Sequence, residues 1–323
     1  MIRFELFFAF FIFAAQFVTA QSILSTKLYR NNGKEVIDID SADFLRIVQS
    51  PDSGSSLFII KEFFPDGRKK SIAHSVTMVP SYEGSYISFH ENGSKKEVSS
   101  YHNGTLSDSV YNFYPNGQLY TVKYEIPWSD QPGAGYGPNY YIQTMRDTTG
   151  KTTVRDGKGY GILYNDDFSS ITASGEFKDG IRDGIWTGEL ILPHLVFTEI
   201  YSKGKLISGE STESDGTINQ YTQDFLDPSP KGGREVFNEY LRKNLKYPVA
   251  AQIRQAQGTF PVEFIVRKDG SFEDIHVAGT IDKSLAEEAI SVVKKSAPWE
   301  PGRIKGKIVE VSYHQVVFFK LSN

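Results

Sequence analysis

One short unit recurs through the first two thirds of the sequence and constrains its fold more than any other feature. The unit is an aromatic residue, one or two further residues, Asn, Asp or Lys, and then glycine; its glycines are Gly67, Gly93, Gly104, Gly117, Gly180 and Gly204. Asn-Gly and Asp-Gly pairs supply the positive φ that two-residue hairpin turns require. Between the turns apolar and polar residues alternate, as in QLYTVKYEI at 118–126, which is typical of strands with one buried face. The pattern predicts antiparallel hairpins over residues 27–220.

The spacing of these units indicates a repeat. Gly93 and Gly117 lie 24 residues apart, as do Gly180 and Gly204, and a fixed period of this length is typical of hairpins that stack on their neighbours. The stretch GEFKDGIRDGIWTGEL at 175–190 has the pattern G-x-F-x-x-G-x-x-x-G. In this pattern the region resembles the MORN-type and YwqK-type repeat families. The resemblance implies an extended antiparallel sheet and leaves open what that sheet binds.

The N-terminal segment MIRFELFFAFFIFAAQFVTAQ has the features of an export signal. Arg3 precedes an apolar run from Leu6 to Val18, and the small residues that end at Ala20 form a cleavage pattern. The interpretation we favour is a signal peptide over residues 1–20, cleaved before Gln21, which predicts a periplasmic protein. The alternative is an uncleaved segment that anchors the protein in the inner membrane with its domains facing the periplasm.

Composition and motifs exclude several classes of function. The sequence has no cysteine, so it forms no disulfide and has no thiol nucleophile. Its formal net charge of −4 argues against a nucleic-acid-binding protein. The histidines are scattered, none at a metal-ligand spacing such as H-x-x-x-H, and there is no G-x-S-x-G motif. We therefore expect no enzyme activity, no cofactor and no metal site; the oligomeric state is not predicted.

The pattern of units breaks at residues 222–232, TQDFLDPSPKG, where two prolines and the absence of periodicity indicate a linker. Charge also changes sign there, from net negative before the segment to net positive after it. The sequence thus predicts a β-hairpin repeat domain over residues 21–221, a linker over 222–232 and a C-terminal domain over 233–323. We expect the C-terminal domain to fold on its own from about Lys231.

The C-terminal domain has a different element pattern. REVFNEYLRKNL at 234–245 places its apolar residues on one helical stripe, and SLAEEAISVVKKS at 284–296 predicts a second amphipathic helix. Alternating strands near 259–267 and 272–278 flank a turn at Asp269-Gly270, and a last apolar strand covers 307–321. The whole chain is therefore predicted to be α+β: an antiparallel β repeat region, and then a helix-strand-strand-helix-strand domain.

These last residues resemble a known family, the C-terminal domain of TonB, the periplasmic energy transducer. The resemblance rests on Tyr247-Pro248, Gly258, the alternating strand that ends at Asp269-Gly270, and the Pro298-Trp299-x-Pro301-Gly302 segment before the last strand. It implies that the partner is an outer-membrane TonB-dependent transporter, which adds a short extended segment beside the last strand. The candidate partner-binding residues are Tyr247, Pro248, Val309, Val311, Tyr313, Gln315, Val317 and Phe319.

The sequence departs from a full TonB transducer in ways that leave two hypotheses open. The family's transducers engage inner-membrane proton-motor proteins through a membrane helix and cross the periplasm on a Pro-rich spacer. Here the N-terminal apolar segment has no histidine, folded repeats occupy the spacer position, and the Gln before Tyr-Pro is missing. The first hypothesis is a component of TonB-dependent transport. The second is a periplasmic scaffold or adaptor that binds protein or envelope-polymer partners without energy transduction.

Trp299, between Pro298 and Pro301, admits two interpretations. A tryptophan that follows the second helix and precedes the last strand can close a small core, with the prolines fixing its entry and exit. It could instead be an exposed binding platform. We favour the core residue, with Gly258, Gly270 and Pro301 as further structural positions. The nearby basic residues are predicted to form a solvated rim: Lys294, Lys295, Arg303, Lys305 and Lys307.

Overall fold

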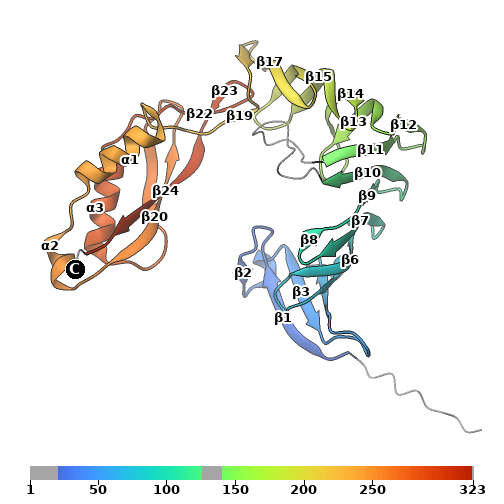
Figure 1. Cartoon of the computed structure of the whole chain (residues 1–323), viewed down its shortest axis with the longest axis horizontal. Helices are drawn as coiled ribbons and strands as arrows, with labels where there is room; N and C mark the ends of the chain where they lie inside the picture. Colours follow the sequence, from blue (N-terminus) through green and yellow to red (C-terminus); the bar gives the residue numbers. More distant parts are fainter. Residues whose placement is uncertain (1–20, 126–139, 322–323) are drawn as a thin grey trace, which may run out of the picture. The chain divides into compact units, whose positions relative to one another are not determined.

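The computed structural model describes residues 21–125 and 140–321 of the 323-residue chain (Figure 1). Antiparallel strands dominate these residues and helices are few, which confirms the α+β class. The chain divides into two compact units, residues 1–120 and 121–323. The predicted signal peptide, residues 1–20, lies outside the described residues. Within them, the search for a helix long and apolar enough to cross a membrane found none.

The first unit is a series of antiparallel strands in which most neighbours in sequence are neighbours in the sheet. β1 pairs with β3, and each strand from β3 to β7 then pairs with the next; β2 pairs with β1, and both β8 and β9 pair with β7. The elements are β1 (Ile23–Tyr29), β2 (Glu35–Val36), the 3-10 helix η1 (Ile39–Ser41), β3 (Phe44–Gln49), β4 (Phe58–Phe63), β5 (Lys69–Ser75), β6 (Tyr82–Phe89), β7 (Lys95–His102), β8 (Thr105–Leu106) and β9 (Val110–Phe113).

The second unit begins with a further series in which every strand pairs antiparallel with the next, from β10 to β18. The strands are β10 (Leu119–Glu125), β11 (Tyr140–Arg146), β12 (Thr152–Arg155), β13 (Lys158–Tyr164), β14 (Ile171–Lys178), β15 (Ile181–Leu190), β16 (Leu195–Ser202), β17 (Lys205–Glu213) and β18 (Ile218–Tyr221). Local hairpin formation thus accounts for both series, since each strand finds its partner within a few residues along the chain.

Aromatic rings packed on glycines hold the second series together. A Cβ atom added at Gly175 would lie 2.5 Å from the Trp186 ring, whose side chain is fully buried, and Gly175 pairs with Trp186 across the strands. The same arrangement places Phe197 against Gly188 in the next pair of strands. Glycines that leave room for a cross-strand ring are a known means of stabilising a curved sheet. The glycine-aromatic spacing of the sequence unit is therefore a packing requirement as well as a turn signal.

All six predicted turn glycines have positive φ, but the turns are of two kinds. At Gly104, Gly180 and Gly204 the preceding residue also has positive φ, as two-residue type I′ turns require. The loops at Gly67, Gly93 and Gly117 are longer. Their Asn or Asp instead accepts a hydrogen bond from the backbone two residues on, as from Arg68 N to Asp66 Oδ1 at 3.0 Å. The prediction of two-residue turns is wrong at these three positions. The Asn or Asp side chain stabilises a longer turn by accepting this hydrogen bond, and the backbone of that residue does not adopt positive φ.

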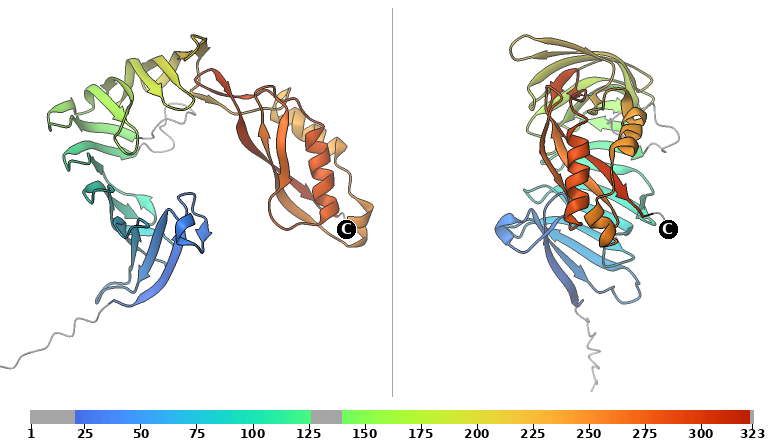
Figure 2. Two further views of the ribbon diagram at one scale, coloured as in Figure 1. Left: turned by 180° about the vertical axis from the view of Figure 1, so that it is seen from behind. Right: turned by 90° about the vertical axis from the view of Figure 1, so that its left-hand side faces the viewer.

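The C-terminal domain is a three-stranded sheet in the order β21-β20-β24 with helices packed on one face (Figures 1 and 2). Inward-facing strand residues such as Phe260 and Val262 share one core with Leu285 and Ala289 of α3. The elements are α1 (Gly233–Asn244), α2 (Val249–Ile253), β20 (Gly258–Val266), β21 (Phe272–Val277), α3 (Lys283–Lys294) and β24 (Val311–Phe319).

A second small sheet, in the order β19-β22-β23, modifies two predictions. β19 (Phe225–Leu226) lies in the stretch predicted to be a linker and pairs with β22 (Gly302–Ile304). β23 (Lys307–Val309) also pairs with β22. The last strand is therefore not continuous over 307–321: the chain changes sheets at Glu310, because the hairpin partner of β23 is β22 and the partner of β24 is β20.

Trp299 lies at the centre of the C-terminal core. Its side chain is 2% exposed and meets the rings of Phe237, Phe264, Phe272 and Tyr313 edge to face. Its indole N–H donates to Ser296 Oγ at 3.1 Å, so the one polar atom of the ring is satisfied. The indole is thus enclosed by the domain and presents no face to a partner.

A prediction concerns Asp282, which caps α3. Its carboxylate accepts hydrogen bonds from the amides of Ser284 and Leu285. The hydrogen bond from the Ser284 hydroxyl and the ion pair with Arg254 hold the pKa of Asp282 below its usual range. A lowered pKa means that the carboxylate stabilises the fold at neutral pH and that this contribution is lost as the pH falls through the folded-state pKa. Asp282→Ala should lower the melting temperature at pH 7, and the difference from wild type should shrink below pH ~4.

Melting curves at pH 3 to 7 measure the effect, with Asp227→Ala, an exposed carboxylate outside any helix, as the control. A difference for Asp282→Ala that does not change with pH would show that the cap acts without its charge.

Candidate functional site

The candidate site is the open edge of β24. This strand of 9 residues pairs with β20 on one side, and no strand in the described part of the chain pairs with its other side. An edge strand with unpaired backbone groups is a template for a further strand.

Pro261 identifies which backbone groups of β24 face this edge. Its carbonyl oxygen accepts from Ala278 N at 3.4 Å, so Pro261 points toward the β21 side of β20. Successive residues of a strand point to opposite sides, so Phe260 and Val262 point toward β24, where their register partners are Val317 and Gln315. The alternate residues of β24 then have their backbone N–H and C=O groups at the open edge; they are Ser312, His314, Val316 and Phe318.

The side chains of β24 alternate as the sequence pattern predicts. Val317 and Phe319 are buried in the domain's own core, and Val311, Tyr313 and Gln315 are half-buried on the same face. These five residues were predicted to bind a partner, but their backbone groups point toward β20. The sixth, Val309, lies in β23 opposite Gly302. The residues whose backbone groups reach the open edge are the alternate set, and no signal in the sequence alone identifies them, because the assignment needs the pairing of β20 with both of its neighbours.

Tyr247 and Pro248 lie at the far end of β24. The Tyr247 ring is 5.5 Å from the Phe319 ring, and its hydroxyl donates to Ala256 O at 2.5 Å. Pro248 caps α2. Gly258 pairs with Phe319, and a Cβ there would lie 2.7 Å from Ile281 Cδ1, so a larger residue at this position requires the end of the Ile281 side chain to shift. Of the pair predicted to border the binding edge, Tyr247 is therefore in contact with the last residue of β24.

The face of the sheet opposite the helices has a polar and an apolar half. His276, Glu263 and His314 stand in register on the three strands, and they line a shallow hollow of about 320 Å³. A hydrogen bond to the Asp274 carbonyl raises the pKa of His276, as does the Glu263 carboxylate 3.4 Å away. Further along β24, Phe318 is 74% exposed and Val316 is exposed beside it.

Within residues 21–125 and 140–321, the described ones, no cluster of three or more His, Cys, Asp or Glu side chains could hold a metal ion.

Comparison with known proteins gives a match for this part of the chain. Residues 243–321 match the family described as Gram-negative bacterial TonB protein C-terminal. This range runs from the end of α1 to the end of β24, so it includes the open edge. Neither a search of curated proteins nor one of solved structures gave a match. The predicted resemblance to the TonB C-terminal family is thus confirmed for these residues; the family is a non-catalytic interaction domain of envelope-associated transport proteins.

Proposed function

We propose that this chain is a periplasmic TonB-like protein whose C-terminal domain binds an extended segment of an outer-membrane TonB-dependent transporter by strand addition to β24. The observation that carries the proposal is the open β24 edge inside the residues that match the TonB C-terminal family. The edge supplies backbone donors and acceptors at alternate positions from Ser312 to Phe318. Main-chain hydrogen bonds of this kind give affinity, and the neighbouring side chains give selectivity.

The remaining parts of the proposal concern the rest of the chain. Residues 1–20 act as a signal peptide, residues 21–221 form MORN-type or YwqK-type repeats, and residues 222–232 connect them to the C-terminal domain at 233–323. The aromatic-on-glycine packing of the second unit supports the repeat assignment, because it recurs from one hairpin to the next.

A second candidate function is a periplasmic scaffold or adaptor that holds protein or envelope-polymer partners without energy transduction. The series of paired strands before the C-terminal domain favours it, since this region stands where a transducer has an extended spacer. In this alternative the chain engages no inner-membrane proton-motor proteins. Uptake of a ligand of TonB-dependent transporters by cells that lack the chain separates the two candidates: uptake should fall if the chain takes part in transport and should be unchanged if it is a scaffold.

Ser312→Pro tests strand addition, because it removes one amide donor at the open edge and none from the pairing with β20. We expect the full chain to fold and its affinity for transporter-derived extended peptides to fall about two- to tenfold, as the loss of one edge hydrogen bond implies. The measurement is isothermal titration, with circular dichroism to check the fold. The matched control is Tyr313→Pro, whose amide points toward β20, and which should unfold the C-terminal domain. Unchanged peptide affinity in a folded Ser312→Pro variant would contradict the proposal.

A further inference from the structure

The tip of the β22-β23 hairpin contacts the last strands of the β10–β18 series, which we call the repeat series. Lys305 and Gly306 form its two-residue turn, with φ of 45° and 82°, between the paired residues Ile304 and Lys307. Lys305 is 7% exposed, so the prediction that it belongs to a solvated rim is wrong. A lysine is rarely buried to this extent unless its charge is paired.

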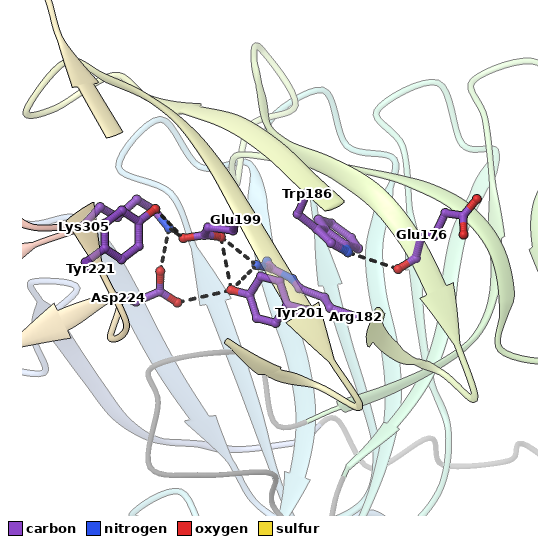
Figure 3. Close-up of polar contacts among 8 residues, drawn as sticks. All are labelled: Glu176, Arg182, Trp186, Glu199, Tyr201, Tyr221, Asp224 and Lys305. Atoms are coloured by element: carbon purple, nitrogen blue, oxygen red, sulfur yellow. Dashed lines mark hydrogen bonds and ion pairs between the residues drawn. The ribbon is translucent and has the colours of Figure 1, made fainter. Parts of the chain in front are cut away.

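The Lys305 ammonium is held by two carboxylates, which Figure 3 shows, and by an aromatic ring. It contacts Glu199, in the middle of β16, and lies 2.6 Å from Asp224 Oδ1. It also lies 3.9 Å from the centre of the Phe197 ring, within the range of a cation–π interaction. Glu199 and Phe197 belong to the repeat series, whereas Lys305 belongs to the residues that match the TonB C-terminal family.

The cluster is balanced in charge. Glu199 is fully buried, and its other oxygen lies 3.9 Å from Arg182 Nη1 (Figure 3). Tyr221 donates to Glu199 at 2.8 Å, and Arg182 donates to the Tyr201 hydroxyl at 3.1 Å. Burial raises the pKa of the Glu199 carboxyl, and the Lys305 ammonium opposes that effect. Two cations thus face two carboxylates, so removal of Lys305 leaves a buried negative charge without its closest partner.

The backbone of the hairpin tip is fixed as well. Lys305 N donates to Asp224 O at 2.7 Å, and Ser211 Oγ donates to Lys305 O at 2.7 Å. A Cβ atom at Gly306 would lie 2.9 Å from Asn219 Cβ, so only glycine fits there. Beside the tip, Lys307 Nζ lies 2.6 Å from Glu213 Oε2. Contacts with β17, β18 and the segment before β19 therefore surround the turn on several sides.

We infer that this hairpin tip is an intramolecular lock, in which Lys305 holds the C-terminal domain in a fixed orientation on the last repeat strands. A single residue, Glu310, separates β23 from β24. The lock therefore also fixes the orientation of the open β24 edge relative to those strands. The inference does not depend on what binds that edge. It differs from the domain organisation expected from sequence, in which residues 222–232 are a linker between two separate domains.

Distance measurements by double electron–electron resonance test the lock in the full chain. The absence of native cysteine allows spin labels at Lys178→Cys and Glu287→Cys. Both positions are exposed; the first lies in β14 of the repeat series and the second in α3 of the C-terminal domain. We expect one narrow distance distribution in the otherwise wild-type protein and a broad one after Lys305→Met. Lys283→Met removes an exposed lysine of the same domain and should leave the distribution narrow.

A second variant covers the case in which Lys305→Met loses its circular dichroism signal. The double variant Glu199→Gln with Lys305→Met leaves Arg182 and Asp224 as a balanced pair, so it restores neutrality without restoring the ammonium bridge. We expect it to fold and to give the broad distribution. A broad distribution in the wild-type background, or a narrow one in whichever Lys305 variant folds, would overturn the inference.

Discussion

Replacing Trp299 with alanine is expected to lower the free energy of unfolding of the C-terminal domain by about 3–5 kcal/mol. The indole is 2% exposed, and the rings of Phe237 and Tyr313 stand 5.0 and 5.2 Å from it. Truncation removes these contacts and leaves a cavity that a small sheet covered by three helices can fill only in part. Since a domain of this kind is stabilised by about 5–15 kcal/mol in total, the loss approaches the limit of what it can tolerate.

Urea unfolding followed by circular dichroism measures this loss, because the substitution removes a fluorescent probe. Trp299→Phe is the matched control: it keeps a ring in the cavity and should cost less than the alanine variant. A Trp299→Ala protein with wild-type stability and weakened peptide binding would instead support the interpretation of Trp299 as a binding platform.

Much of the antiparallel strand series could be predicted because its information is local. An Asn-Gly or Asp-Gly pair determines a turn within two or three residues, and the alternation on either side determines the strands that the turn joins. The kind of turn was less predictable. Asp66-Gly67 and Asp179-Gly180 have the same two residues, yet only Asp179 has positive φ. Pro65, directly before Asp66, fits the longer loop because proline fixes φ near −65°, but Asn92-Gly93 forms the same kind of loop after Glu91, so the preceding residue does not determine the kind of turn.

The features that the sequence did not predict depend on contacts between distant residues. KIVEVSYHQVVFFKL contains no glycine or proline that would mark a break, and only the pairing of β23 with β22 reveals that the chain changes sheets at Glu310. Lys305 and Glu199 are 106 positions apart, and no periodicity links two residues at that separation. A lysine in a basic stretch is usually solvated, so nothing local distinguishes Lys305 from its neighbours.

The candidate site was predicted in part. The resemblance to the TonB C-terminal family indicated the strand, and alternation indicated which side chains share a face. Which backbone groups of β24 face the open edge could be determined only from the pairing of β20 with β21 and β24. In an unpaired strand the same residues could face either edge. Ser312 and Phe318 thus became site residues only when the neighbours of β20 were known.

Gly270→Ala is expected to be as damaging as the loss of the indole, for a reason that lies in the backbone. Gly270 has φ of 81°, and a Cβ there would lie 2.0 Å from the carbonyl oxygen of Trp299. Trp299 packs against this turn, and its backbone N–H donates to Gly270 O at 2.9 Å. Alanine in this conformation costs about 1–2 kcal/mol by itself. The methyl group must also push Trp299 away, which breaks the hydrogen bond and shifts the indole in its pocket, so the total should approach ~3–5 kcal/mol.

Gly279→Ala separates the two contributions, because Gly279 has φ of 89° and nothing within 4 Å of the added Cβ. This variant should show the conformational cost alone, about 1–2 kcal/mol. Urea unfolding of both variants in the full chain gives the comparison. Equal losses would mean that the hairpin turn at Gly270 moves aside without disturbing Trp299. A larger loss for Gly270→Ala would show that the β20-β21 turn and the Pro-Trp-Pro segment are held together, so that the tryptophan is positioned by backbone contact as well as by its ring.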